Sequence, residues 1–459
     1  MKVCVVGTGY VGLTTGICLA YLGHEVTCVD LNQEKVDLLR GGRSPIYEPF
    51  LDELMHEAAH NLTFTTDYAE GVPGAEVVFV AVQTPSLPDG QPDLRYLRMA
   101  AESIGRTIDG EFTVVVNKST VPIGSGNWVE SILRESFEQF HSRRAAGEFA
   151  VASNPEFLRE GSAIHDTLYP DRIVIGSDNP RSLDVLNRLY RAVLNQSFTA
   201  PTFLPRPEEL AAVPLVSTDL ASAELIKYAA NAFLALKISY INEIGKLANK
   251  VGADINQVAR GTGLDARIGS RFLQPGVGWG GSCFGKDTAA LIATAAEYSY
   301  DMPIVAAARE VNRRQREEAV NKLLDELRIL KGRKIGLLGL AFKPNTDDLR
   351  DSPAIDIVRL MIARGAWVKL HDPIAAERFR VEEPELATSL CETVDEVFDD
   401  SDAVVLVTEW PQYLELDWGK YVGLMRTPIV LDGRNVLDPQ RLSRLGYTYL
   451  TIAGRPVGL

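Results

Sequence analysis

Short hydrophobic runs alternate with stretches of helical spacing through the first third of the chain. The runs are rich in β-branched residues, and most end in polar residues; they cover 2–6, 25–29, 77–82, 113–120 and 149–153. This alternation predicts an α/β domain with a mostly parallel sheet. Ligands of such sheets bind beyond the carboxyl ends of the strands, so the polar clusters there are candidate site residues. Turn chemistry alone is the competing interpretation of these clusters.

One helical pattern is much longer than the others and covers residues 219–250. Thr218 or Asp219 can cap its start, and Gly252 follows its end. A helix of this length usually spans two domains or packs against a partner chain. Lys227 and Asn231 are four residues apart on it and therefore share a face. They are either solvated surface residues or, as the surrounding alanines suggest, polar groups that point into a site.

The alternating pattern restarts after about Leu330, with a first segment at 331–343 and further runs at 367–373, 403–410 and 428–435. This second α/β pattern lacks a complete GxGxxG and is expected to hold a different ligand. Lys343, Arg350 and Arg434 follow its strands, where anionic groups would bind. The predicted fold class is therefore α/β, with two Rossmann-like doubly wound domains joined by a long central helix and a helical middle domain. The predicted domains are 1–205, 206–315 and 316–459.

Composition narrows the possible functions. The 459 residues are 46% hydrophobic and 24% charged, which is typical of a globular protein with two or three domains. The formal net charge of −14 argues against nucleic acid as the main partner. The five cysteines form no CxxC pair, so neither a zinc site nor a disulfide framework is indicated, and no metal is expected. The start of the chain does not resemble a signal peptide, and no apolar run is long enough to cross a membrane, so we expect a cytoplasmic protein.

The first hydrophobic run leads into a dinucleotide-binding pattern. Gly7, Gly9 and Gly12 have GxGxxG spacing between a strand and a helix, and Asp30 ends the next strand. The glycines allow a tight turn, approach of a pyrophosphate and close packing of helix on strand. An acidic residue at this place accepts hydrogen bonds from the ribose of NAD and repels the extra phosphate of NADP. The pattern predicts NAD binding.

Cys283 lies in the segment GVGWGGSCFGKD, in which five of the ten residues from 276 to 285 are glycine. A helix is predicted to follow it, with Asp287 near the start. A nearby helix N-terminus and Lys286 favour the nucleophilic thiolate form. The alternative is a buried and inert cysteine, and the small residues around the sulfur favour the reactive interpretation.

Seven sequence blocks, in this order, resemble the UDP-glucose/GDP-mannose dehydrogenase family over nearly the whole chain. They are GTGYVG (7–12), KSTVPIG (118–124), NPEFLREG (154–161), PDRIVIG (170–176), ELIKYAANAF (224–233), GGSCFGKD (280–287) and AFKPNTDDLRDSP (341–353). The resemblance implies an NAD-binding first domain, a UDP-sugar-binding last domain and a central helix that forms a homodimer. It implies oxidation of the C6 alcohol of UDP-glucose to the acid of UDP-glucuronate, with two NAD per substrate.

The resemblance also assigns roles to individual residues. Cys283 matches the nucleophile, which forms a thiohemiacetal and then a thioester. Lys227 matches the group that stabilises an oxyanion, and Asn231 matches its partner. Glu156 matches an acid/base and Asp287 a carboxylate near the sulfur, while Thr120 matches a hydroxyl that holds a water.

Binding residues follow from the same blocks. The implied cofactor residues are Gly7, Gly9, Tyr10, Val11, Gly12, Asp30, Lys35, Thr84, Thr120, Glu160 and Arg350. The implied substrate residues are Glu156, Phe157, Leu158, Lys227, Asn231, Arg267, Phe272, Gly280, Lys343 and Arg434. Arg267 matches an arginine that reaches the site of the neighbouring subunit.

Three alternatives remain open. The same chemistry could act on GDP-mannose or on a UDP-N-acetylhexosamine. A two-electron dehydrogenase of the 3-hydroxyacid type would share the first domain and the Lys–Asn helix but would need no nucleophilic cysteine. A non-catalytic NAD-binding protein would need none of the five residues Cys283, Lys227, Asn231, Glu156 and Asp287.

Overall fold

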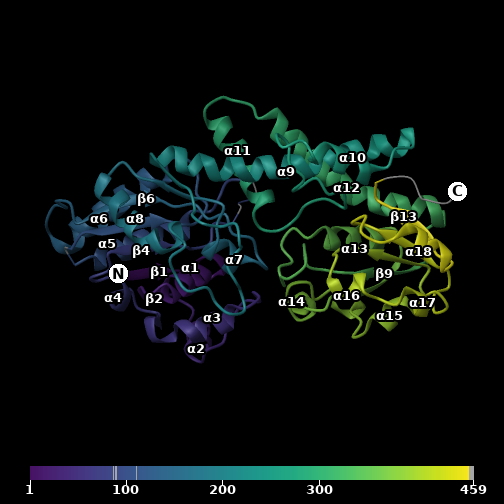
Figure 1. Ribbon diagram of the computed structural model, residues 1–459, viewed down its shortest axis with the longest axis horizontal. Helices are drawn as coiled ribbons and strands as arrows, with labels where there is room; N and C mark the ends of the chain where they lie inside the picture. The colour runs from purple at the N-terminus through teal and green to yellow at the C-terminus, as the bar shows by residue number, and fades with distance from the viewer. Residues whose placement is uncertain (86, 88–89, 110, 454–459) are drawn as a thin grey trace. The chain divides into compact units, whose positions relative to one another are not determined.

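Two separate β-sheets form the frameworks of the chain in the computed structural model (Figure 1). The structure describes residues 1–85, 87, 90–109 and 111–453. The sheets belong to two compact units, one formed by Met1–Ala230 with Ala289–Tyr298 and the other by Asn231–Thr288 with Ser299–Leu459. The fold class predicted from the hydrophobic pattern is confirmed, because both sheets are built mainly of parallel strands with helices between them.

The sheet of the first unit has the strand order β3-β2-β1-β4-β5-β6-β7-β8. Its strands are β1 (Lys2–Val6), β2 (Glu25–Val29), β3 (Leu62–Thr65), β4 (Val77–Val80), β5 (Thr113–Asn117), β6 (Phe149–Ser153), β7 (Ile173–Gly176) and β8 (Leu215–Thr218). The first six form the Rossmann order 3-2-1-4-5-6. All neighbours are parallel except β6 and β7, which meet antiparallel at Ser153 and Gly176. Every residue of β4, β5 and β6 is buried, which explains why these strands are continuous apolar runs.

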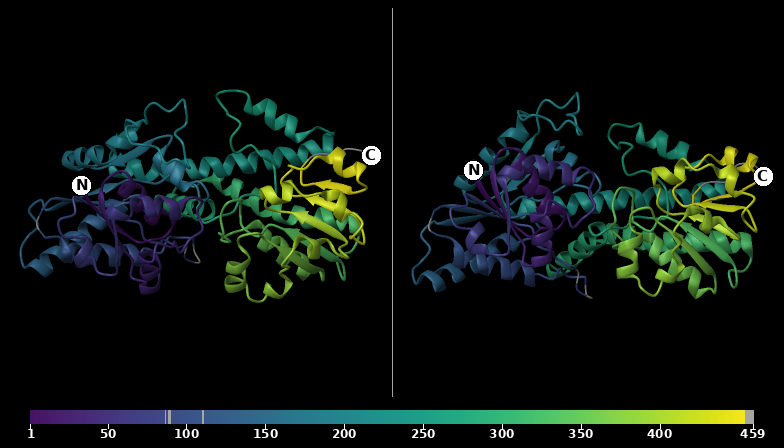
Figure 2. Two further views of the ribbon diagram at one scale, coloured as in Figure 1. Left: turned by 60° about the horizontal axis from the view of Figure 1, so that its bottom comes forward. Right: turned by 90° about the horizontal axis from the view of Figure 1, so that it is seen from below.

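Helices cover both faces of this sheet (Figure 2). They are α1 (Tyr10–Tyr21), α2 (Gln33–Arg40), α3 (Leu51–Ala58), α4 (Tyr68–Gly71), α5 (Arg95–Thr107), α6 (Ser125–His141), α7 (Ala163–Leu168) and α8 (Pro180–Leu194), with a 3-10 turn η1 (Ala59–Asn61). One core contains Leu13 and Ile17 of α1 with Leu186 of α8, and the opposite core contains Ile104 of α5 with Phe137 of α6. The carboxyl ends of the strands between these layers remain available for a site.

The sheet of the second unit has the order β10-β9-β11-β12-β13, and all its neighbouring strands are parallel. Its strands are β9 (Lys334–Leu338), β10 (Trp367–His371), β11 (Ala403–Leu406), β12 (Ile429–Asp432) and β13 (Thr448–Thr451). Apart from the long helix at Leu220–Val251, the later helical elements of the chain are α10 (Ile255–Gly263), α11 (Phe284–Glu297), α12 (Pro303–Leu327), α13 (Pro353–Ala363), α14 (Ala376–Glu382), η2 (Ala387–Ser389), α15 (Val394–Phe398), α16 (Pro411–Leu414), α17 (Trp418–Tyr421) and α18 (Pro439–Arg444). The part of α11 from Ala289 onward belongs to the first unit. Strands β9 to β12 confirm the second α/β pattern read from the sequence.

The long helix α9 (Leu220–Val251) agrees with the predicted 219–250. Asp219 caps it by accepting a 2.7 Å hydrogen bond from the Ser222 N–H. Gly252, with a φ of +76°, follows its end. Within the residues described, no helix is both long and apolar enough to cross a membrane. The division into three domains that was inferred from the sequence stays a prediction.

Candidate active site

The turn after β1 has the geometry of a dinucleotide-binding loop. Gly7 has a φ of +98°, and a Cβ there would lie 2.5 Å from the carbonyl oxygen of Ala81. A Cβ on Gly12 would clash with the carbonyl oxygen of Gly7. Gly9 faces open space and caps α1 without a side-chain bond to the helix. The backbone at Gly7 and Gly12 therefore requires glycine, as predicted, and α1 begins directly after this turn, where a helix N-terminus favours an anion.

Asp30 follows β2 and is tied to this turn. Its Oδ2 accepts hydrogen bonds from the Thr8 N–H at 3.0 Å and the Thr8 hydroxyl at 2.6 Å, and its Oδ1 accepts one from the Asn32 N–H at 3.0 Å. Burial alone would raise the pKa of Asp30, but these hydrogen bonds and Lys35 outweigh it and hold the pKa below its ordinary value. A half-buried, ionised carboxylate at this strand end fits a ribose diol of NAD.

Other predicted cofactor residues surround the same end of the sheet. The Thr84 hydroxyl donates a 3.1 Å hydrogen bond to the carbonyl oxygen of Thr120, so the segments after β4 and β5 meet there. Tyr10, Val11 and Lys35 are all half-exposed, on α1 and α2. Glu160 is half-exposed in the segment after β6. Together with the glycine turn after β1, the polar side chains of these residues fit an NAD molecule.

Glu156 and Lys227 form a buried ion pair in the first unit. The Lys227 Nζ donates to Glu156 Oε1 at 2.9 Å, and their side chains are only 4% and 7% exposed. Glu156 Oε2 also accepts a 2.9 Å hydrogen bond from the Leu158 N–H. This geometry rules out the solvated-surface interpretation of Lys227. An ammonium and a carboxylate held together away from water can stabilise charge or move a proton on a bound substrate.

The Phe157 ring lies beside this pair. The Lys227 Nζ is 5.4 Å from the ring centroid, and the Arg172 guanidinium carbon is 3.6 Å from it. Both are cation–π contacts. Phe157 therefore contacts two cations in the segment that follows β6.

Cys283 immediately precedes α11 in the second unit and is partly exposed. Its carbonyl oxygen accepts the first helical hydrogen bond, from the Asp287 N–H at 2.8 Å. Its Sγ is 3.6 Å from the Ser282 hydroxyl. The predicted position of the thiol at a helix N-terminus is confirmed, and it is one that favours an anionic sulfur.

Asp287 lies in the first turn of α11 and accepts hydrogen bonds from Asn231 and Lys286. Its Oδ2 accepts a 2.6 Å hydrogen bond from Asn231 Nδ2, and its Oδ1 accepts one from Lys286 Nζ at 2.8 Å. Asn231 and Asp287 are both buried. Asn231 is four residues after Lys227 on α9, so the helix places both polar side chains on one face.

The glycines around Cys283 have a different main role from the one inferred from the sequence. A Cβ on Gly280 would clash with the carbonyl oxygen of Asp351, and one on Gly281 would lie 2.7 Å from the Phe342 ring. Gly281 also has a φ of +85° and donates its N–H to the Arg350 carbonyl at 3.0 Å. Close packing against the 341–353 segment requires these glycines, whereas approach to the sulfur was the reason expected.

The second sheet carries a glycine turn that its own carboxylate fills. Asp372 follows β10 and accepts hydrogen bonds from the N–H groups of Leu340 and Ala341 at 2.7 and 3.1 Å. It also accepts one from the Trp410 indole at 3.1 Å. A phosphate at this turn would have to displace a buried carboxylate, which explains physically why this sheet should not repeat the dinucleotide site.

Predicted substrate residues of the second unit occupy varied environments. Arg434 donates to the carbonyl oxygens of Val407 and Phe342 at 2.5 and 3.2 Å and pairs with Glu409 at 3.1 Å. Phe272 makes an edge contact with Phe284, next to Cys283. Lys343 lies 5.4 Å from the Phe342 ring, Arg350 forms a bidentate ion pair with Asp348, and Arg267 is 89% exposed and paired with Asp265.

Lys118 and Glu224 are buried ionisable residues that lie in quoted blocks but were not predicted as site residues. Lys118 donates to Asn154 Oδ1 at 2.9 Å. Glu224 accepts hydrogen bonds from the N–H groups of Gly124 and Gly126 at 2.6 and 2.8 Å and so caps α6. Their burial depends on strands and helices distant in sequence, and only their place inside KSTVPIG and ELIKYAANAF could have drawn attention to them.

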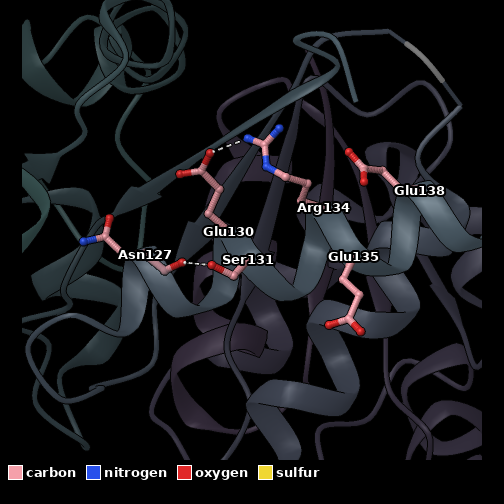
Figure 3. Close-up of a pocket in the computed structure, with 6 residues that line it drawn as sticks. All are labelled: Asn127, Glu130, Ser131, Arg134, Glu135 and Glu138. Atoms are coloured by element: carbon pink, nitrogen blue, oxygen red, sulfur yellow. Dashed lines mark hydrogen bonds and ion pairs between the residues drawn. The ribbon is translucent and has the colours of Figure 1, made fainter. Parts of the chain in front are cut away.

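A separate open groove of about 530 Å³ runs along α6 (Figure 3). Its lining comes from a single helix and includes the Glu130–Arg134 ion pair at 2.9 Å. None of the predicted site residues lines it. Over the described part of the chain, no group of three or more His, Cys, Asp and Glu side chains is placed to hold a metal ion.

Comparison with known proteins gives a consistent result. Three family models match successive parts of the chain: the NAD binding domain of the UDP-glucose/GDP-mannose dehydrogenase family over residues 1–194, its central domain over 221–314 and its UDP binding domain over 336–439. The UDP-glucose 6-dehydrogenase TuaD of Bacillus subtilis (strain 168) is 43% identical, over 99% of this chain and 93% of that protein. The UDP-glucose 6-dehydrogenase of Rhizobium meliloti (strain 1021) is 44% identical, over 99% of this chain and all of that protein.

Solved structures of related dehydrogenases resemble this chain over nearly its whole length. A UDP-glucose dehydrogenase from Pyrobaculum islandicum is 39% identical with a TM-score of 0.87, covering 99% of this chain and 98% of that one. A UDP-D-ManNAc dehydrogenase from Pyrococcus horikoshii is 26% identical with a TM-score of 0.82, covering 98% and 99%. The residues of both units and these similarities lead to one conclusion: the chain belongs to the UDP-glucose/GDP-mannose dehydrogenase family.

Proposed function

We propose that the chain is a UDP-glucose 6-dehydrogenase, which oxidises the C6 alcohol of UDP-glucose to the carboxylate of UDP-glucuronate with two NAD. The single observation that carries this proposal is the position of Cys283, at the start of α11 and one turn before the Asp287–Asn231 pair. Relatives that are named UDP-glucose 6-dehydrogenases and match the whole chain at over 40% identity support the choice of sugar nucleotide.

The first unit contributes the groups for the first oxidation. The glycine turn and Asp30 would hold NAD, which would supply the hydride acceptor for each oxidation at C6. A base removes the proton of the alcohol, and the Lys227 ammonium stabilises the negative charge that develops on the oxygen. Glu156, held 2.9 Å from Lys227, is the acid/base that exchanges this proton.

Covalent capture then separates the two oxidations. The Cys283 thiolate adds to the C6 aldehyde and forms a carbon–sulfur bond, and the resulting oxyanion takes a proton to give a thiohemiacetal. Loss of the second hydride and of that proton gives a thioester. Water, which Thr120 and Asp287 are proposed to hold, attacks the thioester carbon and gives one proton to Glu156. Cleavage of the carbon–sulfur bond then returns the thiolate, and the carboxylic acid formed loses its remaining proton to solvent.

The measurement that tests this function is the number of NADH molecules formed per sugar nucleotide. We expect two per UDP-glucose, with UDP-glucuronate as product. Cys283→Ala should form no acid, whereas a dehydrogenase of the 3-hydroxyacid type would not depend on this residue. One NADH per substrate, or faster turnover of GDP-mannose or a UDP-N-acetylhexosamine, would contradict the assignment.

A homodimer through α9 accompanies this proposal. In the second unit, Phe233, Tyr240, Leu247 and Val251 of α9 are exposed at spacings of seven, seven and four residues, which places them along one face. A helix face with such residues usually packs against a partner, and a second copy of the chain would cover it. Sedimentation should show a dimer for the natural chain and a shift toward monomer for Tyr240→Glu.

Arg267 is proposed to serve the site of the partner subunit, in keeping with its exposed side chain. Mixing inactive Arg267→Ala and Cys283→Ala proteins, with exchange of subunits, should then restore activity. In a mixed dimer, one site has both an intact Cys283 and an arginine from the other chain. No recovery after verified exchange would contradict the proposal.

A further inference from the structure

Lys118 is a buried lysine for which the mechanism above has no role. It directly follows β5, and its Nζ donates to Asn154 Oδ1 at 2.9 Å. Asn154 Oδ1 also accepts a 2.5 Å hydrogen bond from the Tyr190 hydroxyl, and Asn154 Nδ2 donates to the Val174 carbonyl at 2.7 Å. Lys118, Asn154 and Tyr190 are all buried, so this network is shielded from solvent.

The network adjoins the reactive segment after β6. Asn117 of β5 lies opposite Ser153 of β6, and the Asn154 N–H donates to the Asn117 carbonyl at 3.0 Å. Asn154 is two residues before Glu156, which pairs with Lys227. Lys118 therefore holds the first residue of the NPEF turn, whose third residue is the acid/base.

A purely structural role explains this lysine poorly. Burying an ammonium costs much more free energy than burying a neutral hydrogen-bond donor, and the amide oxygen of Asn154 does not neutralise it. The nearby opposite charge is that of Glu156. The Lys118 ammonium attracts the Glu156 carboxylate, whereas a neutral hydrogen-bond donor at the same place would not.

We propose that Lys118 is a positioning residue for the oxidation, which fixes the NPEF turn through Asn154 and supplies a positive charge beside Glu156 that holds its carboxylate directed at Lys227. This role rests on the proposed function, because it acts through the proposed acid/base. It predicts that the reaction needs the Lys118 ammonium and that its loss lowers kcat more than it changes either KM.

The charges around Lys118 set the pH range in which this role can be observed. Burial lowers the pKa of Lys118 to about 8; Glu156 opposes this shift and Lys227 adds to it. Tyr190 on α8, which shares the Asn154 oxygen with Lys118, is a further titratable neighbour, and burial raises its pKa. Lys118 is therefore charged below about pH 8 and loses its proton above it, so activity should fall on the alkaline side as the ammonium is lost.

The test compares kcat–pH profiles of the full-length natural protein, Lys118→Met, Lys118→Arg and Tyr190→Phe, with UDP-glucose and NAD. For the natural protein we expect an alkaline fall near pH 8. Lys118→Met should lower kcat by about 10-fold or more, with both KM values within about 2-fold, and should lack this fall. Lys118→Arg, which keeps its charge at high pH, should recover part of the activity and move the fall to higher pH.

Tyr190→Phe is the matched control, since it removes a hydrogen bond to the same Asn154 oxygen without changing charge. It should keep the alkaline fall. The inference is overturned if folded Lys118→Met keeps the natural profile, or if Lys118→Arg falls at the same pH as the natural protein. Should Lys118→Met not fold, the comparison of Lys118→Arg with Tyr190→Phe decides. Absence of NADH from the natural protein would instead overturn the proposed function.

Discussion

Asn231 on α9 and Asp287 on α11 are joined by a 2.6 Å hydrogen bond between Nδ2 and Oδ2, with both side chains buried. The other oxygen of Asp287 accepts from Lys286 at 2.8 Å. Because Asp287 is one turn after Cys283, this carboxylate links α9 to the start of the helix that follows the thiol.

The Asp287→Asn variant should be nearly inactive. It keeps the shape of the side chain but removes the charge that pairs with Lys286 and one acceptor for Asn231. We expect kcat to fall by roughly 100-fold, the loss typical of a catalytic polar group. Steady-state NADH formation measures it, with Glu310→Gln on the exposed face of α12 as control. Equal losses in the two variants, or none in Asp287→Asn, would contradict this role.

Asp30 should determine the preference for NAD. Asp30→Asn removes the charge that repels the extra phosphate of NADP while keeping an acceptor for Thr8. We expect the KM for NAD to rise about 10-fold and the ratio of kcat/KM values for NAD over NADP to fall. Asp37→Asn on α2 is a nearby control with an exposed side chain. An unchanged ratio would show that Asp30 does not contact the cofactor.

Glu224 should make stability depend on pH. Burial raises its pKa to about 7, although hydrogen bonds from Gly124 and Gly126 oppose the shift. Because the folded-state pKa lies above the ordinary value, the folded protein holds this proton more tightly than the unfolded one. The stabilisation is complete below the ordinary pKa of 4.5 and is lost as the pH rises through about 7.

Urea midpoints of the natural protein and Glu224→Gln measure this effect. Relative to the variant, the natural protein should lose on the order of 1 to 3 kcal/mol of unfolding free energy between about pH 5 and pH 8. Parallel curves, or a relative gain at the higher pH, would mean that the two backbone N–H groups favour the ionised carboxylate.

Cys283 should be the first cysteine to react with iodoacetamide. Burial raises the pKa of Cys28 to about 12 and also raises those of Cys4 and Cys18. Cys391 is partly exposed, but burial raises its pKa as well. Peptide mass spectrometry over a time course should show Cys283 labelled first, with parallel loss of activity. Earlier labelling of Cys391 would argue against an activated thiol at position 283.

The sequence predicted those elements whose boundaries depend on nearby residues. Strands β1 and β2 and the helix α9 were predicted to within one residue, because Gly7, Asp30 and Asp219 mark where they end or begin. The antiparallel contact of β6 with β7 could not be read from periodicity, since buried strands of either direction have the same apolar pattern.

Among the site residues, too, local sequence predicted some positions, whereas others depend on contacts that are distant in sequence. The glycine turn and Cys283 were found from local spacing, which also predicted the helix start. Lys118 and Glu224 were not, because a lysine or glutamate in a polar segment usually lies in solvent. Their burial arises from Tyr190 on α8 and from the start of α6, and neither contact has a signal in the neighbouring sequence.

The most direct test of the account is the mass of the peptide carrying Cys283 after acid quenching of the enzyme during turnover with UDP-glucose and NAD. We predict an acyl adduct of the oxidised sugar nucleotide on Cys283, and neither adduct nor acid with Cys283→Ala. An unmodified Cys283 throughout turnover, together with natural rates of acid formation by Cys283→Ala, would contradict covalent capture.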